Sequence, residues 1–422
     1  MSENIYPKVS TFEAAGNGVS ASPQFPKLEE AVLDYWKKDG TFQASIDNRE
    51  AGPHGDNEFV FYDGPPFANG LPHYGHLLTG YAKDLVARYQ TQRGHKVERR
   101  FGWDTHGLPA ELEAMKQLGM TDKQEILEMG IDNFNDAARA SVLKYTNEWE
   151  QYVTRQARWV DFENDYKTLN VEYMESVIWA FKRLYDKGLT YQGFRVLPYC
   201  WKDETPLSNH ELRMDDDVYQ DRQDQTVTVA FTLTADDSLA ANKNIVAELA
   251  GVEALAWTTT PWTLPSNLAL TVHPTSTYAK FRVDGQTYIM AKALIPSVFP
   301  GQEVEMLEEM EGQSLRGMAY EPLYRFSEPD KKAWYVICDN YVTMEDGTGI
   351  VHTAPAFGED DNRVCREKGL PFVSYVDTEG KMTGETKWPG VFVKEADPLI
   401  LKDLEDRGLL FRALPFAHDY PF

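Results

Sequence analysis

Apolar positions in the first part of the chain alternate between helical and strand-like spacing. Residues 26–39 place their apolar side chains on one helical face, and the pattern stops at Gly40. The run FVFY at 59–62 predicts a short strand, apolar residues at helical spacing follow over 77–89, and KVERRF at 96–101 predicts a second strand. Strand, helix and strand in this order predict a βαβ unit of a parallel sheet.

Two irregular loops follow the predicted strands. DGPPFANGLPHYGH at 63–76 is interrupted by prolines and glycines, and GWDTHGLP at 102–109 resembles it in composition. Ligands of parallel sheets bind beyond the carboxyl ends of the strands. We therefore expect both loops to border one crevice.

The first loop ends on two histidines, His73 and His76, at the start of the predicted helix. A helix N-terminus favours phosphate, and two imidazoles can donate hydrogen bonds to phosphoryl oxygens. Gly75 between them would let a flat group such as a nucleobase approach the backbone. This pattern suits nucleotidyl transfer, although histidines at a helix start also serve as partial caps or surface residues.

The second half of the chain has a different character. Short β-type runs with intervening turns extend over 223–393 and predict a separate mixed β domain inserted into the α/β sheet. One motif, AWTTTPWTLPSN at 256–267, carries three consecutive hydroxyls, and another, GTGIVHTAPAFGEDD at 347–361, carries one histidine and a closing acidic pair. Taken alone, the first fits an ordinary β-edge and the second a surface turn, and one histidine is weak evidence for a metal.

Composition narrows the class of protein. A chain of 422 residues predicts two or three domains, and a net charge of −24 argues against broad, charge-driven nucleic-acid binding. Three cysteines far apart match no disulfide framework, which indicates a reducing compartment and so the cytoplasm. No apolar run approaches 18 residues, so we expect no membrane association, and residues 1–25 are predicted to form a flexible leader.

The long motifs around the histidines resemble a known family. GPPFANGLPHYGH is similar to the signature region of class I aminoacyl-tRNA synthetases, whose HIGH motif reads HYGH at 73–76. Together with GWDTHGLPAE, RWVDFENDYKT at 158–168 and TPLSNHEL at 205–212, it resembles the isoleucyl-tRNA synthetases in particular. The resemblance extends from about residue 26 to residue 422.

This resemblance implies an α/β fold: the first half of a Rossmann-type parallel-sheet nucleotide-binding domain with an inserted mixed, β-barrel-like editing domain. The implied boundaries are 26–200 for the first half of the catalytic domain, 201–395 for the editing domain and 396–422 for a return toward the catalytic domain. The implied activity is ATP-dependent activation of isoleucine and its transfer to the isoleucine tRNA.

The resemblance also assigns residues to the activation site. His73 and His76 would be catalytic and, with Gly75, would bind ATP, which enters with Mg²⁺ as a substrate. Asp104 would hold the α-ammonium group of isoleucine, and Pro65 would shape the pocket for its side chain. The alternative for Asp104 is a helix-capping aspartate.

A second set of residues is implied for hydrolytic editing of valine wrongly attached to the isoleucine tRNA. Its members lie in the two motifs of the second half: Trp257, Thr258, Thr259, Thr260, Asn267, His352 and Asp361. The threonines and the asparagine would bind the terminal adenosine and the ester at the tRNA 3′ end, and the aspartate would anchor the α-ammonium group. The tryptophan and the histidine would bound a cavity that admits valine and excludes isoleucine.

Two features depart from the family pattern. The chain ends at Phe422 without a KMSKS-like sequence, so we expect a part of such an enzyme that retains only the editing site. Cys200 stands where some relatives have a cysteine-rich zinc element, but the other ligands are missing, and we expect no zinc. The alternatives are a non-catalytic module that binds the tRNA 3′ end and a stand-alone nucleotidylyltransferase.

Overall fold

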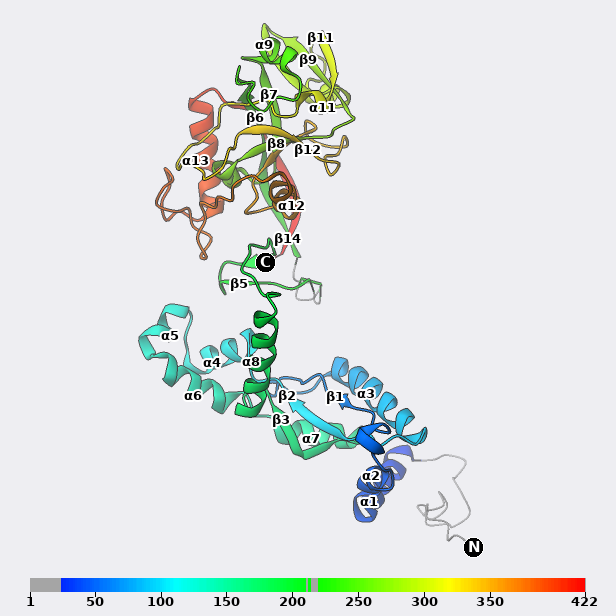
Figure 1. Ribbon diagram of the computed structural model, residues 1–422. Coiled ribbons are helices and arrows are strands. Elements are labelled where there is room, and N and C mark those ends of the chain that lie inside the picture. The colour runs from blue at the N-terminus through cyan, green and yellow to red at the C-terminus, as the bar shows by residue number, and fades with distance from the viewer. Residues whose placement is uncertain (1–23, 210–211, 214–218, 422) are drawn as a thin grey trace. The chain divides into compact units, whose positions relative to one another are not determined.

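A computed structural model describes residues 24–209, 212–213 and 219–421 (Figure 1). The chain divides into two units, residues 1–192 and 193–422, which are described separately below. The leader predicted for residues 1–25 lies outside the described residues up to position 23, and helix α1 begins at Phe25. Two positions of the TPLSNHEL motif, 210 and 211, also lie outside them.

Unit 1 is built on a three-stranded sheet of β1 (Phe61–Tyr62), β2 (Arg99–Trp103) and β3 (Asp161–Lys167), in the order β1-β2-β3. Both strand pairs are parallel. Helix α3 (Tyr74–Gln92) joins the first two strands, as Figure 1 shows. The βαβ unit predicted from the apolar spacing is therefore confirmed.

The remaining helices of unit 1 surround this sheet in sequence. They are α1 (Phe25–Asp39), α2 (Thr41–Asp47), α4 (Leu108–Leu118), α5 (Lys123–Met129), α6 (Ile131–Ser141), α7 (Thr146–Arg155) and α8 (Val171–Asp186). Helix α1 ends at Gly40, whose φ of 66° is left-handed and favours glycine, as the sequence pattern predicts.

The core of unit 1 is aromatic. Phe101 and Trp103 of β2 pack with Trp149 and Val153 of α7, and all four are almost fully buried. The two indole N–H groups donate to partners in other segments, Trp149 to the Gly70 carbonyl at 2.9 Å and Trp103 to an Asp165 carboxylate oxygen at 2.7 Å. The apolar contacts and these hydrogen bonds hold the 63–76 loop against the sheet.

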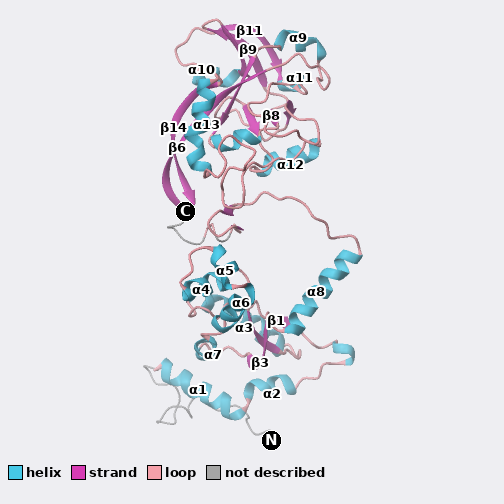
Figure 2. Ribbon diagram, turned by 90° about the vertical axis from the view of Figure 1, so that its left-hand side faces the viewer, coloured by secondary structure: helices cyan, strands magenta, loops and turns pink. Residues whose placement is uncertain are grey.

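Unit 2 contains a nine-stranded mixed sheet (Figure 2). Its strands are β6 (Tyr219–Thr232), β7 (Glu253–Thr258), β8 (Ala269–Val272), β9 (Thr277–Val283), β10 (Gln286–Ala291), β11 (Glu305–Glu311), β12 (Tyr335–Cys338), β13 (Ile350–Thr353) and β14 (Leu410–Pro421). The order is β11-β9-β10-β7-β13-β8-β12, and β6 pairs with β7 and β14. The mixed β architecture predicted for the second half is confirmed.

Short helices and one small strand pair complete unit 2. They are β4 (Tyr199–Cys200) with β5 (Thr205–Pro206), α9 (Val246–Leu249), the 3₁₀ helix η4 (Pro261–Ser266), α10 (Ile295–Val298), α11 (Gly312–Leu315), α12 (Glu359–Lys368) and α13 (Val393–Asp406). The core gathers buried side chains from nearly every strand of the sheet and from α13.

The segment 396–422 was expected to return toward the catalytic domain, and its described part instead adds α13 and β14 to unit 2. Strand β14 runs antiparallel beside β6, as Figures 1 and 2 show, and satisfies its backbone groups there. In the described part of the chain, no helix is both long enough and apolar enough to span a bilayer.

Gly102 provides a test of the unit 1 sheet. A Cβ atom at this position of β2 would overlap the Tyr166 ring, which is held in place because its hydroxyl donates to the Asp63 carbonyl at 2.5 Å. We predict that Gly102→Ala destabilises β2 and β3 by about 1–3 kcal/mol, so their amides exchange hydrogen roughly 5- to 160-fold faster. Hydrogen–deuterium exchange followed by mass spectrometry measures this. Gly70→Ala is the control, because a Cβ atom there meets open space, and equal exchange in both variants would contradict the prediction.

Candidate functional site

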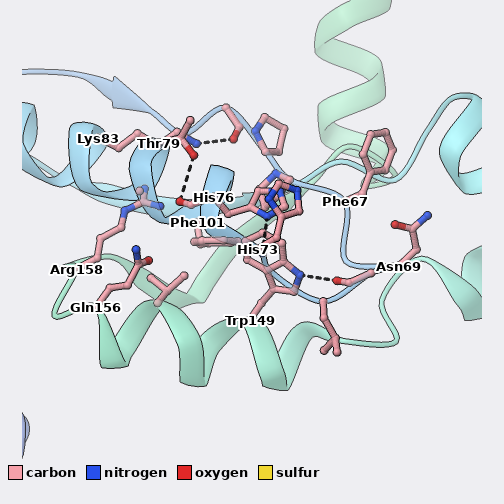
Figure 3. A pocket seen from close by; sticks show the side chains of 17 residues that line it. Phe67, Asn69, His73, His76, Thr79, Lys83, Phe101, Trp149, Gln156 and Arg158 are labelled. Carbon is pink, nitrogen blue, oxygen red and sulfur yellow. Dashed lines mark hydrogen bonds between the residues drawn. The ribbon is translucent and has the colours of Figure 1, made fainter. Parts of the chain in front are cut away.

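A cavity of about 510 Å³ lies at the carboxyl end of the unit 1 strands (Figure 3). It is lined by the loop that follows β1, by the start of α3 and by side chains of α7, among them Pro65, His73, His76, Lys83, Trp149 and Arg158. The predicted position of the site, beyond the strand ends, therefore holds for the first loop. The second loop, 102–109, adds no lining residue.

The two histidines cap helix α3 with their own rings. The Gly75 N–H donates to Nδ1 of His73, and the His73 N–H donates to Nδ1 of His76, each at 3.1 Å. The ring centroids are 3.8 Å apart, and His76 also packs edge-on against Trp149 at 4.6 Å. The helix start therefore does not present these N–H groups to a ligand, because the imidazoles occupy them.

This capping fixes the protonation of both rings. A nitrogen that accepts a hydrogen bond carries no proton, so each neutral imidazole keeps its proton on Nε2. Partial burial lowers the pKa of His76, and the charges of His73 and Lys83 act in the same direction. The pair consequently offers two Nε2–H donors, which is the hydrogen-bonding character that phosphoryl oxygens require.

Gly75 is needed for the His73 ring. A Cβ atom at position 75 would come within 2.9 Å of Cε1 of that ring, so the folded-back imidazole needs glycine there. This contact gives the glycine a structural role in addition to the nucleobase approach inferred from the sequence. Tyr74, the residue between, is 89% exposed and does not line the cavity.

A buried charge cluster at the cavity wall was missed in the sequence. The Asp63 carboxylate is buried and forms ion pairs with Lys83 at 2.5 Å and with Arg158 at 2.7 Å. Lys83 also donates to the Gly64 carbonyl at 2.7 Å, and Figure 3 shows both basic side chains at the cavity. Two cations face one carboxylate, which leaves net positive charge beside the imidazoles. The strand-end position of Asp63 was a usable signal, but its partner 95 residues away was not.

Asp104 and Pro65 take different positions. Pro65 lines the cavity, as expected for a pocket-shaping residue. Asp104 accepts the His106 N–H at 3.2 Å across its own turn, and its N–H donates to the Pro66 carbonyl at 2.9 Å. It does not cap helix α4, whose N-cap is Gly107. The two loops thus touch through their backbones, while the Asp104 carboxylate lies outside the lining of the histidine cavity.

In unit 2 the threonine motif forms a cluster of hydroxyls at the end of β7. Thr258 Oγ1 lies 3.3 Å from Thr260 Oγ1 and accepts the Thr260 N–H at 3.1 Å. Thr260 Oγ1 lies 3.3 Å from Thr263 Oγ1, which also donates to the Thr260 carbonyl at 2.8 Å. Thr259 and Trp257 are half-buried neighbours of this cluster. Thr263 was not predicted, although it falls inside the same motif.

His352 and Asn267 join the two motifs in the interior. His352 Nε2 lies 2.9 Å from Thr263 Oγ1, and its Nδ1 lies 2.9 Å from the Asn267 amide nitrogen. That amide also donates to the Ala269 carbonyl at 2.9 Å and accepts the Tyr320 hydroxyl at 2.7 Å. Both residues are buried and fully bonded, so the structure places them behind the threonines as supporting groups and not at a surface.

Asp361 belongs to a separate network on α12. Its carboxylate accepts the Ala354 N–H at 2.9 Å and the Tyr341 hydroxyl at 3.2 Å. Burial is the main cause that raises the pKa of Asp361 to about 6, and the charge of Asp360 adds to it, while the two hydrogen bonds oppose it. The carboxylate is thus close to its titration point near neutral pH.

Metal-binding geometry is not found among the residues that the structure describes. They contain no group of three or more His, Cys, Asp or Glu side chains that could hold an ion. The thiol of Cys200 donates to an Asp203 carboxylate oxygen at 3.3 Å.

Comparison with known proteins gives consistent matches along the chain. The family model described as tRNA synthetases class I (I, L, M and V) matches residues 31–350. An isoleucine–tRNA ligase of Leifsonia xyli subsp. xyli is 53% identical over 439 residues, covering 97% of this chain and 38% of that protein. One from Mycobacterium tuberculosis is 52% identical, covering 100% and 40%. The chain therefore spans about two fifths of the length of these curated relatives.

Solved structures resemble part of the chain weakly. A crystal structure described as GlLeuRS-CP1 matches with a TM-score of 0.36 and 16% identity, covering 44% of this chain and 98% of that one. The Plasmodium knowlesi cytosolic leucyl-tRNA synthetase editing domain matches with a TM-score of 0.35 and 13% identity, covering 47% and 97%.

The Asp63 cluster yields a stability prediction. Asp63→Asn removes the charge that pairs with Lys83 and with Arg158, whose side chain is only 7% exposed. We expect unit 1 to lose about 3–5 kcal/mol, because an uncompensated buried charge remains. Urea unfolding, followed by hydrogen exchange in unit 1 peptides, measures the loss. The control is Glu29→Gln, which breaks an exposed pair with Arg155 and should cost less than about 1 kcal/mol. Equal effects would show that Asp63 is not a structural anchor.

Proposed function

This chain belongs to the class I tRNA synthetase family (I, L, M and V), and we propose that it is part of an isoleucine–tRNA ligase whose own activity is hydrolytic editing of valyl-tRNA. The curated relatives, which are 52–53% identical, carry the ligase name, and they are about two and a half times as long as the matched region. Activation of isoleucine and its transfer to tRNA are proposed for the longer protein.

One observation carries the editing proposal. The hydrogen bond of 2.9 Å between Thr263 and His352 joins two motifs that lie 89 residues apart in the chain. Through it the predicted threonines, Asn267 and His352 form one connected cluster in unit 2. A connected set of hydroxyls at a strand end, backed by buried polar groups, is a suitable binding surface for a tRNA 3′ end and its ester.

The proposed reaction needs only water. Water adds to the ester carbonyl carbon, and the bond from this carbon to the ribose oxygen breaks. The two protons of the water go to the ribose oxygen and to solvent, leaving free valine and the tRNA hydroxyl. The Asp361 carboxylate would pair with the α-ammonium group, and the threonine hydroxyls would hold the water and the adenosine.

Energetics explains why a second site is required. One methylene in an apolar pocket supplies about 1–3 kcal/mol of discrimination, a figure for which isoleucine against valine is itself the standard example. A smaller cavity that admits valine and excludes isoleucine multiplies this selectivity. Trp257, which packs against Gly347, is positioned to limit such a cavity.

The cavity of unit 1 supports the activation half of the proposal. Two Nε2–H donors and the excess charge of Lys83 and Arg158 suit the phosphates of ATP, and Mg²⁺ would enter coordinated by those phosphates. Asp104 does not line this cavity, so we propose editing and not activation for this chain by itself. We also propose a cytoplasmic location, because all three cysteines are free.

The first test measures deacylation of valyl-tRNA of the isoleucine type. We expect the chain to release valine and Asp361→Asn to lower kcat/KM roughly 10- to 150-fold, because one charge-assisted contact of about 1.5–3 kcal/mol is lost. The asparagine can keep the contacts to Ala354 and Tyr341. Asp360→Asn is the control, since its exposed carboxylate pairs with Arg363.

Other outcomes would redirect the proposal. Tight binding of the tRNA 3′ end without hydrolysis would establish a binding module in place of an editing site. Isoleucine-dependent pyrophosphate exchange by this chain would overturn the restriction to editing.

The pH dependence follows from Asp361. Its raised pKa, about 6, means that the carboxyl is neutral below that pH and cannot pair with an ammonium group. We predict that kcat/KM for deacylation, corrected for uncatalysed hydrolysis, rises up to tenfold per unit below pH 6 and levels off above pH 7. Burial lowers the pKa of His352 to about 3, so it stays neutral throughout. A profile that is flat between pH 5 and 7, or unchanged in Asp361→Asn, would contradict this assignment.

A further inference from the structure

Behind the threonines, a continuous row of hydrogen-bonded side chains runs into the interior of unit 2. From the interior outward its members are Tyr320, Asn267, His352, Thr263, Thr260 and Thr258. The four inner members are buried, while Thr260 is half-buried. A row of this kind can run in either direction, and the direction decides whether its outer end donates or accepts.

The Ala269 carbonyl sets the direction. A carbonyl oxygen only accepts, so the group of Asn267 that lies 2.9 Å away must be the amide nitrogen. The same nitrogen faces Nδ1 of His352, and because it only donates, Nδ1 must be the acceptor. Burial raises the pKa of Tyr320 well above its ordinary value, so its hydroxyl keeps its proton and donates to the remaining Asn267 oxygen.

The histidine passes this direction to the hydroxyls. With Nδ1 as acceptor, the neutral ring carries its proton on Nε2 and donates it to Thr263 Oγ1. The proton of Thr263 then goes to the Thr260 carbonyl, which is 2.8 Å away and can only accept. In the contact between Thr263 and Thr260, Thr260 must therefore be the donor, and by the same argument Thr258 donates to Thr260.

Each outer hydroxyl thus commits its proton inward. Toward a ligand, Thr258 and Thr260 present oxygen lone pairs and no free proton. A group bound there has to donate a hydrogen bond, and a water that donates becomes more electron-rich at its oxygen.

We propose that Thr263 and Tyr320 are positioning residues that fix the direction of this row, so that Thr258 and Thr260 accept hydrogen bonds from the water that attacks the ester. The proposal rests on the editing function proposed above. It assigns His352 a role through Thr263 in place of contact with the substrate. Neither Thr263 nor Tyr320 touches the reacting atoms.

The kinetic test uses two variants at one position. Thr263→Val keeps the shape and removes the hydroxyl, and we expect kcat for valyl-tRNA deacylation to fall at least tenfold with KM changed less than twofold. Thr263→Ser restores the hydroxyl and should return kcat to within threefold of wild type. Thr386→Val is the matched control, because Thr386 makes the same bond to the carbonyl three residues earlier, at 2.9 Å, outside the row. An unchanged kcat in Thr263→Val would overturn the proposal.

A second measurement needs no activity. The ¹⁵N chemical shifts of the His352 ring report which nitrogen carries the proton, and we expect Nε2 to be protonated and Nδ1 bare between pH 5 and 8. In Tyr320→Phe, the Asn267 oxygen loses its donor, and we expect a mixture of the two tautomers. A proton on Nδ1 in the wild type overturns the direction of the row. Absent wild-type hydrolysis overturns the editing function and with it the role of the water, while the shifts still decide the direction.

Discussion

The buried carboxylate of Asp63 is the constraint on which unit 1 depends. A charge that is removed from water must be paired, and here the pairing groups come from α3, through Lys83, and from the segment before β3, through Arg158. The Asp63 carbonyl receives the Tyr166 hydroxyl from β3 as well. These contacts fix the separation of the strand ends, and the cavity exists because that separation is fixed. They also leave one positive charge in excess on the wall that the imidazole N–H groups face.

Unit 2 meets the same requirement with neutral groups. Its interior polar atoms are amides, hydroxyls and an uncharged imidazole, each with a partner, and burial removes His352 from titration by lowering its pKa to about 3. The carboxylate of Asp361 is kept apart on α12, where a raised pKa of about 6 leaves it able to gain or lose charge. The neutral network is therefore insensitive to pH, while the residue proposed to recognise an ammonium group is not. This separation allows the same unit to be rigid at its threonines and responsive at its acid.

Local patterns predicted the local structure well. Helical spacing and a following Gly40 located α1, β-type runs coincided with β9 and β10, and two histidines after a Pro/Gly-rich loop marked the start of α3. The contacts between distant segments were out of reach. Arg158 and Asp63 are 95 residues apart, and Thr263 and His352 are 89 apart, so no periodicity connects them. The pairing of β14 with β6 depends on which edge of the sheet is open, and that is a property of the assembled sheet.

The imidazole caps of α3 couple the fold to whatever fills the cavity. A phosphate that takes a hydrogen bond from Nε2–H of His73 or His76 draws electron density through the ring and makes Nδ1 a better acceptor, because linked hydrogen bonds polarise one another. The bonds from the Gly75 and His73 N–H groups shorten in response, so a filled cavity tightens the first turn of the helix and an empty one loosens it. Recognition and helix initiation are in this sense cooperative. The exposed side chain of Tyr74 stands outside this exchange and is the position in the motif with the greatest freedom to vary.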